Sequence, residues 1–349
     1  MGLATEVIIA GIWAPGLAEK EAQANNINIV RIKTFADRFR NNIVVKVAAT
    51  ILFNVYAFLR FKKQKVNYIN CHSLWVLPLC VALKKATGAK LIYDAHELET
   101  EREGLRGMQQ KFAKYLERKL IGHIDKMIVV GHFIAEWYKN SYGMQQVYVV
   151  RNIPLKQNRI QVKTCLLKDK FQIPYNDVLF IYQGVLSVAR GINLLLDVFA
   201  NSSPSKHIVF MGYGPSEGVI KAFAKRHANI HFQTAVPLSE IMSYSSSADI
   251  GIFFIEKKPS LSYEYSLPNK FFEYIYSGIP MLISNFPEMK QLIDEFNCGW
   301  QVNSSATSLA EFINTVSAEM IKDKTPDIER FSNALHWEKE AEQFREIYV

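Results

Sequence analysis

The sequence predicts an α/β protein built from two successive Rossmann-like domains. Its 349 residues exceed what one ordinary hydrophobic core holds. Short β-branched runs alternate with longer amphipathic runs, which is typical of βαβ units and a parallel sheet. The alternation stops near Asn152–Pro154 and restarts after a lysine-rich stretch. We therefore predict domains at 1–155 and 156–336, with a ligand-binding cleft between the two halves.

Each domain is predicted as a series of strands and helices. In the first half, strands are expected at 6–10, 27–32, 66–71, 90–93, 126–130 and 147–150, and helices at 40–65, 74–87 and 107–121. In the second half, strands are expected at 178–183, 207–211, 230–232, 250–254 and 280–283, and helices at 191–199, 214–227, 238–245, 269–277 and 288–295.

Composition narrows the class of protein. The hydrophobic content of 49% and charged content of 21% are those of a globular chain. The four cysteines are far apart and never spaced as CxxC, which argues against a disulfide framework or zinc ribbon and favours a reducing, cytoplasmic compartment. The net charge of +8 favours phosphate-bearing ligands or an anionic surface. No nucleic-acid-binding module is recognisable and the basic residues are dispersed, so we expect no nucleic-acid partner.

The most informative segment is S-L-P-N-K-F-F-E-Y-I-Y-S-G-I-P at 266–280. Ser266 is a candidate helix cap, and Pro268 suits a first helical turn. The free amides at such a helix start favour an anion, and Lys270 adds a positive charge. Glu273, one turn further on, can accept hydrogen bonds from two ribose hydroxyls. An ordinary capped helix is the alternative interpretation.

This segment resembles the donor-site helix of glycosyltransferase family 4, in which a P-N-K-x-x-E-Y run precedes a small-G-x-P turn. Four further pieces are similar to the family in the same order. They are Q-G at 183–184 with R-G at 190–191, G-Y-G-P at 212–215, the stretch from P-L-S-E at 237–240 to A-D-I-G at 248–251, and N-F-P-E at 285–288.

The resemblance implies a GT-B fold and a donor site for a nucleotide diphosphate sugar. Val185 replaces the usual basic residue beside the first glycine, so Arg190 and Lys270 are the candidates for the diphosphate. Tyr265 stands at the position of the family's first glutamate, whereas Glu273 occupies the second, ribose-binding position. The implied donor-binding residues are Glu273, Gly184, Asn269, Gly212 and Gly214, and the implied catalytic residues are His96, Arg190 and Lys270.

The first domain resembles the family's acceptor side through D-A-H-E at 94–97. There the resemblance implies that His96 lies beside the reacting sugar, whereas a strand-end histidine is otherwise commonly a structural loop residue. His96 and Glu97 do not begin an H-E-x-x-H motif, so no helical zinc site is predicted. His72, which follows the strand that ends at residue 71, could face the same cleft, but we expect a structural role for it. A helix at 337–349 resembles the family's terminal helix that packs on the first domain, and the family's first βα unit has no counterpart here.

The resemblance further implies a retaining glycosyltransferase that needs no metal or other cofactor, in which His96 orients donor and acceptor. Its acceptor is expected to be a glycan or lipid-linked glycan, in cell-surface polysaccharide synthesis. Two alternatives remain open. The first is a nucleotide-sugar 2-epimerase, which shares the two-domain architecture. The second is a non-catalytic partner that binds a nucleotide sugar, which the missing βα unit and Val185 favour.

An anionic membrane surface is a further predicted partner. The stretch 43–65 is apolar over much of its surface and ends in Arg60, Lys62, Lys63 and Lys65. Charged and polar residues interrupt it, so we do not expect it to span a bilayer. An interfacial helix uses both an apolar face and a basic cluster. A packed helix with a solvated basic end is the alternative.

Overall fold

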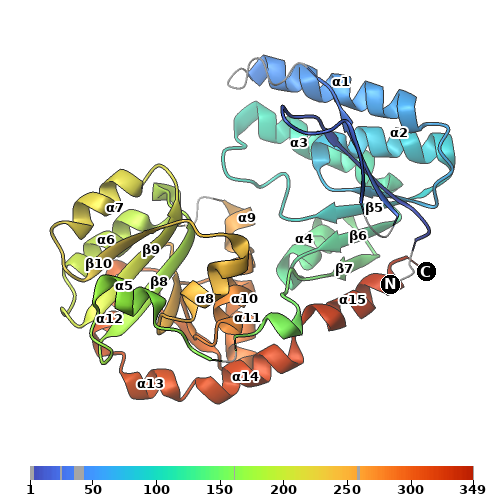
Figure 1. Cartoon of the computed structure of the whole chain (residues 1–349). Coiled ribbons are helices and arrows are strands. Elements are labelled where there is room, and N and C mark those ends of the chain that lie inside the picture. Colours follow the sequence, from blue (N-terminus) through green and yellow to red (C-terminus); the bar gives the residue numbers. More distant parts are fainter. Residues whose placement is uncertain (1–3, 24–25, 35–42, 161, 258–259, 349) are drawn as a thin grey trace. The chain divides into compact units, whose positions relative to one another are not determined.

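The structure is a computed structural model that describes residues 4–23, 26–34, 43–160, 162–257 and 260–348. It confirms the two-domain α/β fold, and the chain divides into two compact units (Figure 1). The first unit comprises Met1–Val130, Ile134–Val150 and Gln343–Val349, and the second comprises Gly131–Phe133 and Arg151–Glu342. The chain thus leaves the first unit at Val150 rather than at the predicted residue 155.

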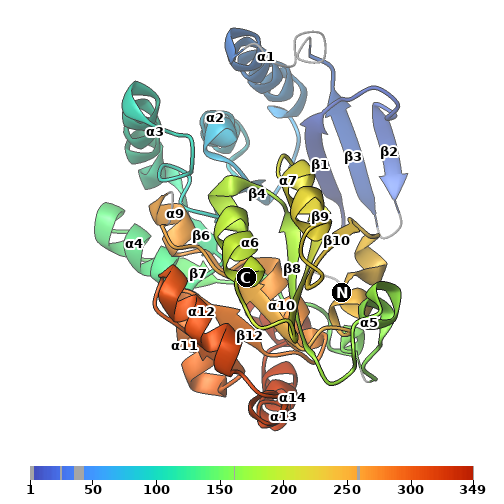
Figure 2. The ribbon, with the colours of Figure 1, turned by 90° about the vertical axis from the view of Figure 1, so that its left-hand side faces the viewer.

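Two sheets form the framework of the first unit. A parallel four-stranded sheet has the order β4-β5-β6-β7, and a three-stranded sheet has the order β1-β3-β2, in which β2 runs antiparallel to β3 (Figure 2). The strands are β1 Val7–Ile12, β2 Lys20–Gln23, β3 Ile27–Ile32, β4 Tyr68–Cys71, β5 Lys90–Ala95, β6 Lys126–Val129 and β7 Val147–Val149. The helices are α1 Ile43–Phe61, α2 Leu77–Thr87, α3 Gly107–Leu120 and α4 His132–Tyr142.

One side of helix α1 packs on the first unit. Phe53 and Ala57 are buried against Leu79 and Leu83 of α2, because residues four apart share a helix face. The predicted helix 40–65 starts at residues that lie outside the described ones, and α1 ends at Phe61. Among the described helices, none combines the length and hydropathy that a bilayer span requires.

The second unit is built on one parallel six-stranded sheet of order β10-β9-β8-β11-β12-β13. Its strands are β8 Val178–Val185, β9 Lys206–Tyr213, β10 Ile230–Thr234, β11 Ile250–Phe253, β12 Met281–Ile283 and β13 Gly299–Gln301. Its helices are α5 Leu166–Phe171, α6 Ile192–Ala200, α7 Glu217–Ala224, α8 Ile241–Ser245, α9 Leu261–Glu264, α10 Asn269–Tyr276, α11 Pro287–Phe296, α12 Ala306–Thr315, α13 Ala318–Lys322 and α14 Thr325–Ala334. The last helix, α15 Trp337–Glu346, begins in the second unit and ends in the first, to which Gln343–Val349 belong.

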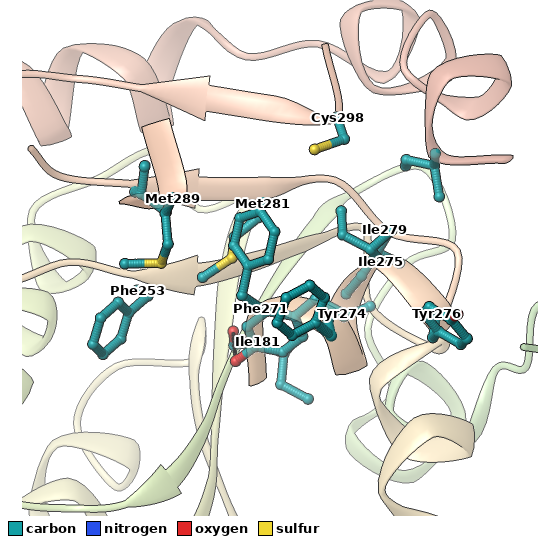
Figure 3. Packing of buried hydrophobic residues seen from close by; sticks show 14 of the residues in the cluster. Ile181, Phe253, Phe271, Tyr274, Ile275, Tyr276, Ile279, Met281, Met289 and Cys298 are labelled. Atoms are coloured by element: carbon teal, nitrogen blue, oxygen red, sulfur yellow. Dashed lines mark hydrogen bonds between the residues drawn. The ribbon is translucent and has the colours of Figure 1, made fainter. Parts of the chain in front are cut away.

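Strand β8 is buried on both faces, so its sequence is a continuous apolar run instead of an alternating one. Leu179 and Ile181 point into a core cluster shared with α10, α11 and α14. Phe180 and Tyr182 point into the opposite cluster, shared with α6 and α12. Figure 3 shows the first cluster, in which Phe271, Tyr274 and Ile275 of α10 lie among the labelled core residues. The position of α10 is therefore fixed by the core.

The predicted cap of α10 is wrong. Pro268, with extended backbone, is the cap residue, and no side chain caps the helix. The Ser266 hydroxyl is buried, with no hydrogen-bond partner among the described residues. Ser260 instead caps the short helix α9, where its hydroxyl accepts a hydrogen bond from the Tyr263 amide.

Candidate functional site

A buried lysine marks the candidate site in the second unit. Lys270, in the first turn of α10, is only 7% exposed, and its ammonium has no hydrogen-bond partner among the described residues. The Nζ atom lies 4.3 Å from the centre of the Tyr182 ring and 4.8 Å from that of Phe253. Burial lowers the pKa of Lys270 to about 7, the nearby Arg190 charge adds to the decrease, and Glu273 opposes it. Burying a cation without a partner is costly, so Lys270 is a candidate to bind an anion.

Glu273 lies one turn after Lys270 on the same side of α10. Its Oε2 accepts a hydrogen bond from Gln183 Nε2, and Gln183 Oε1 accepts one from Ser245 Oγ at 2.5 Å. Burial raises the pKa of Glu273, whereas Gln183 and Lys270 oppose that rise. The chain Ser245–Gln183–Glu273 therefore fixes one carboxylate oxygen, Oε2 of Glu273.

The orientation of α10 relative to β8 depends on Tyr274. Its buried hydroxyl donates to the Ile181 carbonyl at 3.1 Å and accepts from the Gln183 amide at 2.9 Å. A methyl group on Gly251 would meet the Tyr274 ring at 2.3 Å, so only glycine fits there. Helix and strand are thus held in one register, with Lys270 beside Gly184 at the end of β8.

Glycines let the ends of β8 and β9 come together. Gly184 pairs with Gly212 in the sheet, and a Cβ on Gly212 would lie 1.9 Å from the Gly184 carbonyl oxygen. A Cβ on Gly184 itself would lie 3.3 Å from Lys270 Nζ. Gly214 donates its amide to Glu217 Oε1 at 3.1 Å, at the start of α7. The backbone at this edge can therefore approach a ligand closely.

Arg190 ends a short 3-10 turn, Val188–Arg190, directly before α6. Its guanidinium carbon lies 5.7 Å from the centre of the Tyr263 ring. Its charge lowers the pKa of Lys270 and opposes the rise that burial causes in the pKa of Tyr182, so it lies within electrostatic reach of both. The structure therefore brings together the predicted residues Arg190, Lys270, Glu273, Gly184 and Gly212, and places Asn269 exposed at the first position of α10.

His96 belongs to the first unit and follows the end of β5. It is exposed, and its Nε2 lies 3.2 Å from Nδ1 of His72, with the two rings stacked. His72 Nδ1 also lies 3.3 Å from Asp94 Oδ2, and Asp94 raises the pKa of His72 although burial opposes it. His72 was predicted to be structural, but its side chain is 59% exposed and stands in the same cluster as His96.

The sequence did not identify Tyr182, Tyr263 or Ser245 as residues of these two clusters, and it indicated Asp94 only as part of the D-A-H-E segment, without a role. The aromatic pair Tyr182 and Phe253 was visible only as core hydrophobicity. The contact of Asp94 with His72 depends on the pairing of β4 with β5, which no local pattern encodes.

Comparison with known proteins identifies both halves. Residues 5–153 match the family model described as Glycosyltransferase Family 4, and residues 177–319 match the one described as Glycosyl transferases group 1. A search of curated protein sequences found no match.

Solved structures share the fold at low sequence identity. Sucrose-phosphate synthase from Thermosynechococcus elongatus is similar with a TM-score of 0.75 and 15% identity, over 98% of this chain and 88% of that one. HepE from Anabaena, in complex with UDP and glucose, has a TM-score of 0.69 and 13% identity, over 93% and 86%. WaaG, a glycosyltransferase involved in lipopolysaccharide biosynthesis, has a TM-score of 0.67 and 12% identity, over 94% and 88%.

Proposed function

Since this chain belongs to glycosyltransferase family 4, we propose that it transfers a sugar, with retention of anomeric configuration, from a nucleotide diphosphate sugar to a glycan or lipid-linked glycan. The setting we propose is cell-surface polysaccharide synthesis in the cytoplasm. The observation that carries the donor half is the buried ammonium of Lys270 beside Arg190 and Glu273, which has no hydrogen-bond partner in the described part of the chain. The names of HepE bound to UDP and glucose and of WaaG are consistent with such a substrate class.

The donor diphosphate is the anion that Lys270 lacks. Arg190 supplies a second cation, and the first amides of α10 add the positive end of the helix dipole. Charge grows on the leaving diphosphate as the glycosidic bond breaks, so fixed cations stabilise the transition state more than the ground state. These groups are proposed to provide the charge stabilisation, and the proposal includes no metal cofactor.

Glu273 is proposed to hold the donor ribose. Its Oε2 is oriented by Gln183, and its remaining acceptor capacity suits the two ribose hydroxyls. Gly184 lies beside Lys270, and Gly212 pairs with Gly184 in the sheet, so the two glycines are proposed to allow the donor to approach the backbone. In the first unit, the exposed imidazole of His96 is proposed to orient donor and acceptor groups during transfer, without acting as a nucleophile.

Donor binding is tested by thermal shift with a panel of nucleotide diphosphate sugars, since a ligand that binds only the folded state raises the melting temperature. Glu273→Gln should then weaken the best donor roughly tenfold or more, as expected for a charged hydrogen bond of about 1.5–3 kcal/mol. Glu311→Gln, which changes an exposed carboxylate on α12, is the matched control. Equal donor affinities of the Glu273 and Glu311 variants would remove the ribose assignment.

Turnover separates the proposal from its alternatives. With donor and a lipid-linked acceptor, the transferase should release nucleoside diphosphate and glycosylate the acceptor, and His96→Ala should abolish this at an unchanged melting temperature. An epimerised sugar formed from donor alone would identify a 2-epimerase. Tight donor binding with no product from any acceptor would identify a non-catalytic partner.

We also propose that α1 attaches the protein reversibly to an anionic membrane, as a peripheral protein. Its side opposite the core exposes Val47, Ile51, Val55 and Leu59, each close to half exposed or more. The basic residues Arg60, Lys62, Lys63 and Lys65 follow at its end. Near anionic lipid each cation contributes about 1 kcal/mol, so the attachment should be salt-sensitive.

Co-sedimentation with phosphatidylserine-containing vesicles tests this attachment. Binding should be present at low salt and lost at high salt, and it should fall when the four cations are changed to Gln. Ile51→Ser with Val55→Ser should weaken it as well, because both side chains are exposed and apolar. Absence of binding at low salt refutes the proposal.

A further inference from the structure

A second cluster of potential ligands lies at the carboxyl edge of the four-stranded sheet. The pairing of β4 with β5 ends at Cys71 opposite Tyr93, so the next residues, His72 and Asp94, come side by side. Asp94 lies at the end of β5 and His96 follows that strand directly, so both residues come to the same edge of the sheet. Three metal-ligating side chains thus converge from two neighbouring strand ends.

Their geometry fits one ion. One ligand atom from each of His72, Asp94 and His96 lies within 4.8 Å of the other two. His72 Nδ1 lies 3.2 Å from His96 Nε2 and 3.3 Å from Asp94 Oδ2. Two ligand atoms at about 2.0–2.1 Å from a tetrahedral zinc ion are about 3.3 Å apart. The separations of 3.2 Å and 3.3 Å therefore match two edges of a tetrahedral coordination shell.

Hydrogen bonding alone explains the cluster less well. A single N–H on His72 Nδ1 can serve the Asp94 carboxylate or the His96 nitrogen, but both acceptors approach that same atom. The histidine pair of the second unit shows the contrast. His207 uses Nε2 toward Asp177 and Nδ1 toward His231, so its partners lie on opposite ends of the ring and do not converge.

We propose that His72, Asp94 and His96 bind one divalent transition-metal ion, with Zn²⁺ as the best match, and that the bound ion inhibits the protein. Two imidazoles and one carboxylate suit Zn²⁺, whereas Mg²⁺ and Ca²⁺ prefer oxygen ligands. Three protein ligands leave a fourth position for water. The inhibitory half rests on the proposed function, because the ion occupies the His96 nitrogen that would otherwise face the substrates.

Metal binding is tested on the full, untagged chain after treatment with a chelator. A Cys165→Ser background removes the exposed thiol as a competing ligand. Titration with Zn²⁺ should show one site per chain, and Co²⁺ should give the visible absorption of a four-coordinate ion. His72→Ala and Asp94→Asn should each weaken binding about tenfold or more, on the scale by which loss of supporting groups weakens metal sites. His123→Ala, at another exposed histidine, is the matched control.

Each outcome decides one half of the proposal. If His72→Ala and Asp94→Asn bind Zn²⁺ as tightly as the His123 variant, the site is refuted, while circular dichroism of each variant excludes loss of fold as the cause. In a transfer assay, Zn²⁺ should inhibit the parent protein at about tenfold lower concentration than His72→Ala, each relative to its own metal-free rate. One-site Zn²⁺ binding with full transfer activity overturns the inhibition alone. One-site binding by a chain that transfers no sugar overturns the proposed function and leaves the site standing.

Discussion

Replacing Lys270 by Met should stabilise the second unit while it abolishes sugar transfer. Methionine keeps the length and apolar body of the side chain, and its sulfur packs well against the Tyr182 and Phe253 rings. It removes an ammonium that is 7% exposed and has no hydrogen-bond partner among the described residues. Since the same charge is proposed to bind the diphosphate, stability and function should change in opposite directions.

The magnitude follows from the pKa. Burial and Arg190 lower the pKa of Lys270 from 10.5 to about 7, and one unit is 1.36 kcal/mol, so the charged form is disfavoured on the order of 4–5 kcal/mol. The ring faces of Tyr182 and Phe253 return about 1 kcal/mol each. A net gain on the order of 2 kcal/mol should raise the melting temperature by about 4–8 °C for a unit of this size.

The sign of the pH dependence gives a second check. Between pH 7 and 10.5 the unfolded chain holds the Lys270 proton and the folded chain does not, so the wild type gains stability as pH rises. The advantage of Lys270→Met should therefore be largest near neutral pH and disappear by about pH 10.5.

The assay is thermal unfolding at pH 7 and pH 10, with Lys225→Met as the control at an exposed lysine. The Lys225 variant should unfold like the wild type at both pH values. If Lys270→Met melts at or below the wild-type temperature at pH 7, protein groups already compensate the charge of the ammonium. Lys270 would then need no anionic ligand, and its assignment to the diphosphate would be refuted.

Two further predictions concern the framework of the same unit. Gly212→Ala should destabilise it by about 3 kcal/mol or more in urea unfolding, because the new Cβ would lie 1.9 Å from the Gly184 carbonyl oxygen; Gly218→Ala, whose Cβ meets nothing within 4 Å, should be neutral or slightly stabilising, and the reverse order would contradict the geometry. Asp249 pairs with Lys163 and Lys168 and accepts the Leu179 amide, and although burial opposes ionisation, these partners lower its pKa below 3.8. The stabilisation by ionised Asp249 is complete above pH 3.8 and is lost as pH falls through the lowered pKa. The difference in free energy of unfolding between the wild type and Asp249→Asn should therefore decrease in acid. A difference in that free energy that does not depend on pH would exclude the ion pairs as its cause.

The sequence predicted the framework best where burial is uniform. β8 was expected at 178–183 and is observed at Val178–Val185. It could be predicted because a strand that is buried on both faces has a continuous apolar sequence. β2, with the sequence K-E-A-Q, was not predicted, because its residues show no alternation of apolar and polar side chains. It is an edge strand that pairs with β3. A strand defined by its partner leaves little trace in its own residues.

Local signals were less reliable at the site itself. Serine is a preferred residue type at helix caps, but Ser266 does not cap α10, whose cap residue is Pro268. A capping side chain must lie within reach of the first helical amides, and the residue type alone does not determine this. Conversely, the proximity of His72 to Asp94 and His96 follows from the pairing of β4 with β5, because His72 lies more than 20 residues earlier in the sequence. Residue types suggested the chemistry, whereas convergence came only from tertiary structure.

The core of the second unit explains how helix α10 tolerates the buried ammonium of Lys270. Phe271, Phe272, Tyr274 and Ile275 of α10 are at most 1% exposed, and each such side chain contributes about 1.5–3 kcal/mol on burial. Together they exceed the several kcal/mol that burying Lys270 costs, so α10 stays docked even though its first turn carries an unfavourable charge. Phe272→Ala removes one of these contributions and should make the first turn of α10 more exposed to solvent. The pKa of Lys270 should then rise toward its ordinary value, and NMR titration of the lysine side chain measures that pKa. If the pKa remains near 7 in that variant, the site around Lys270 is held independently of the α10 core.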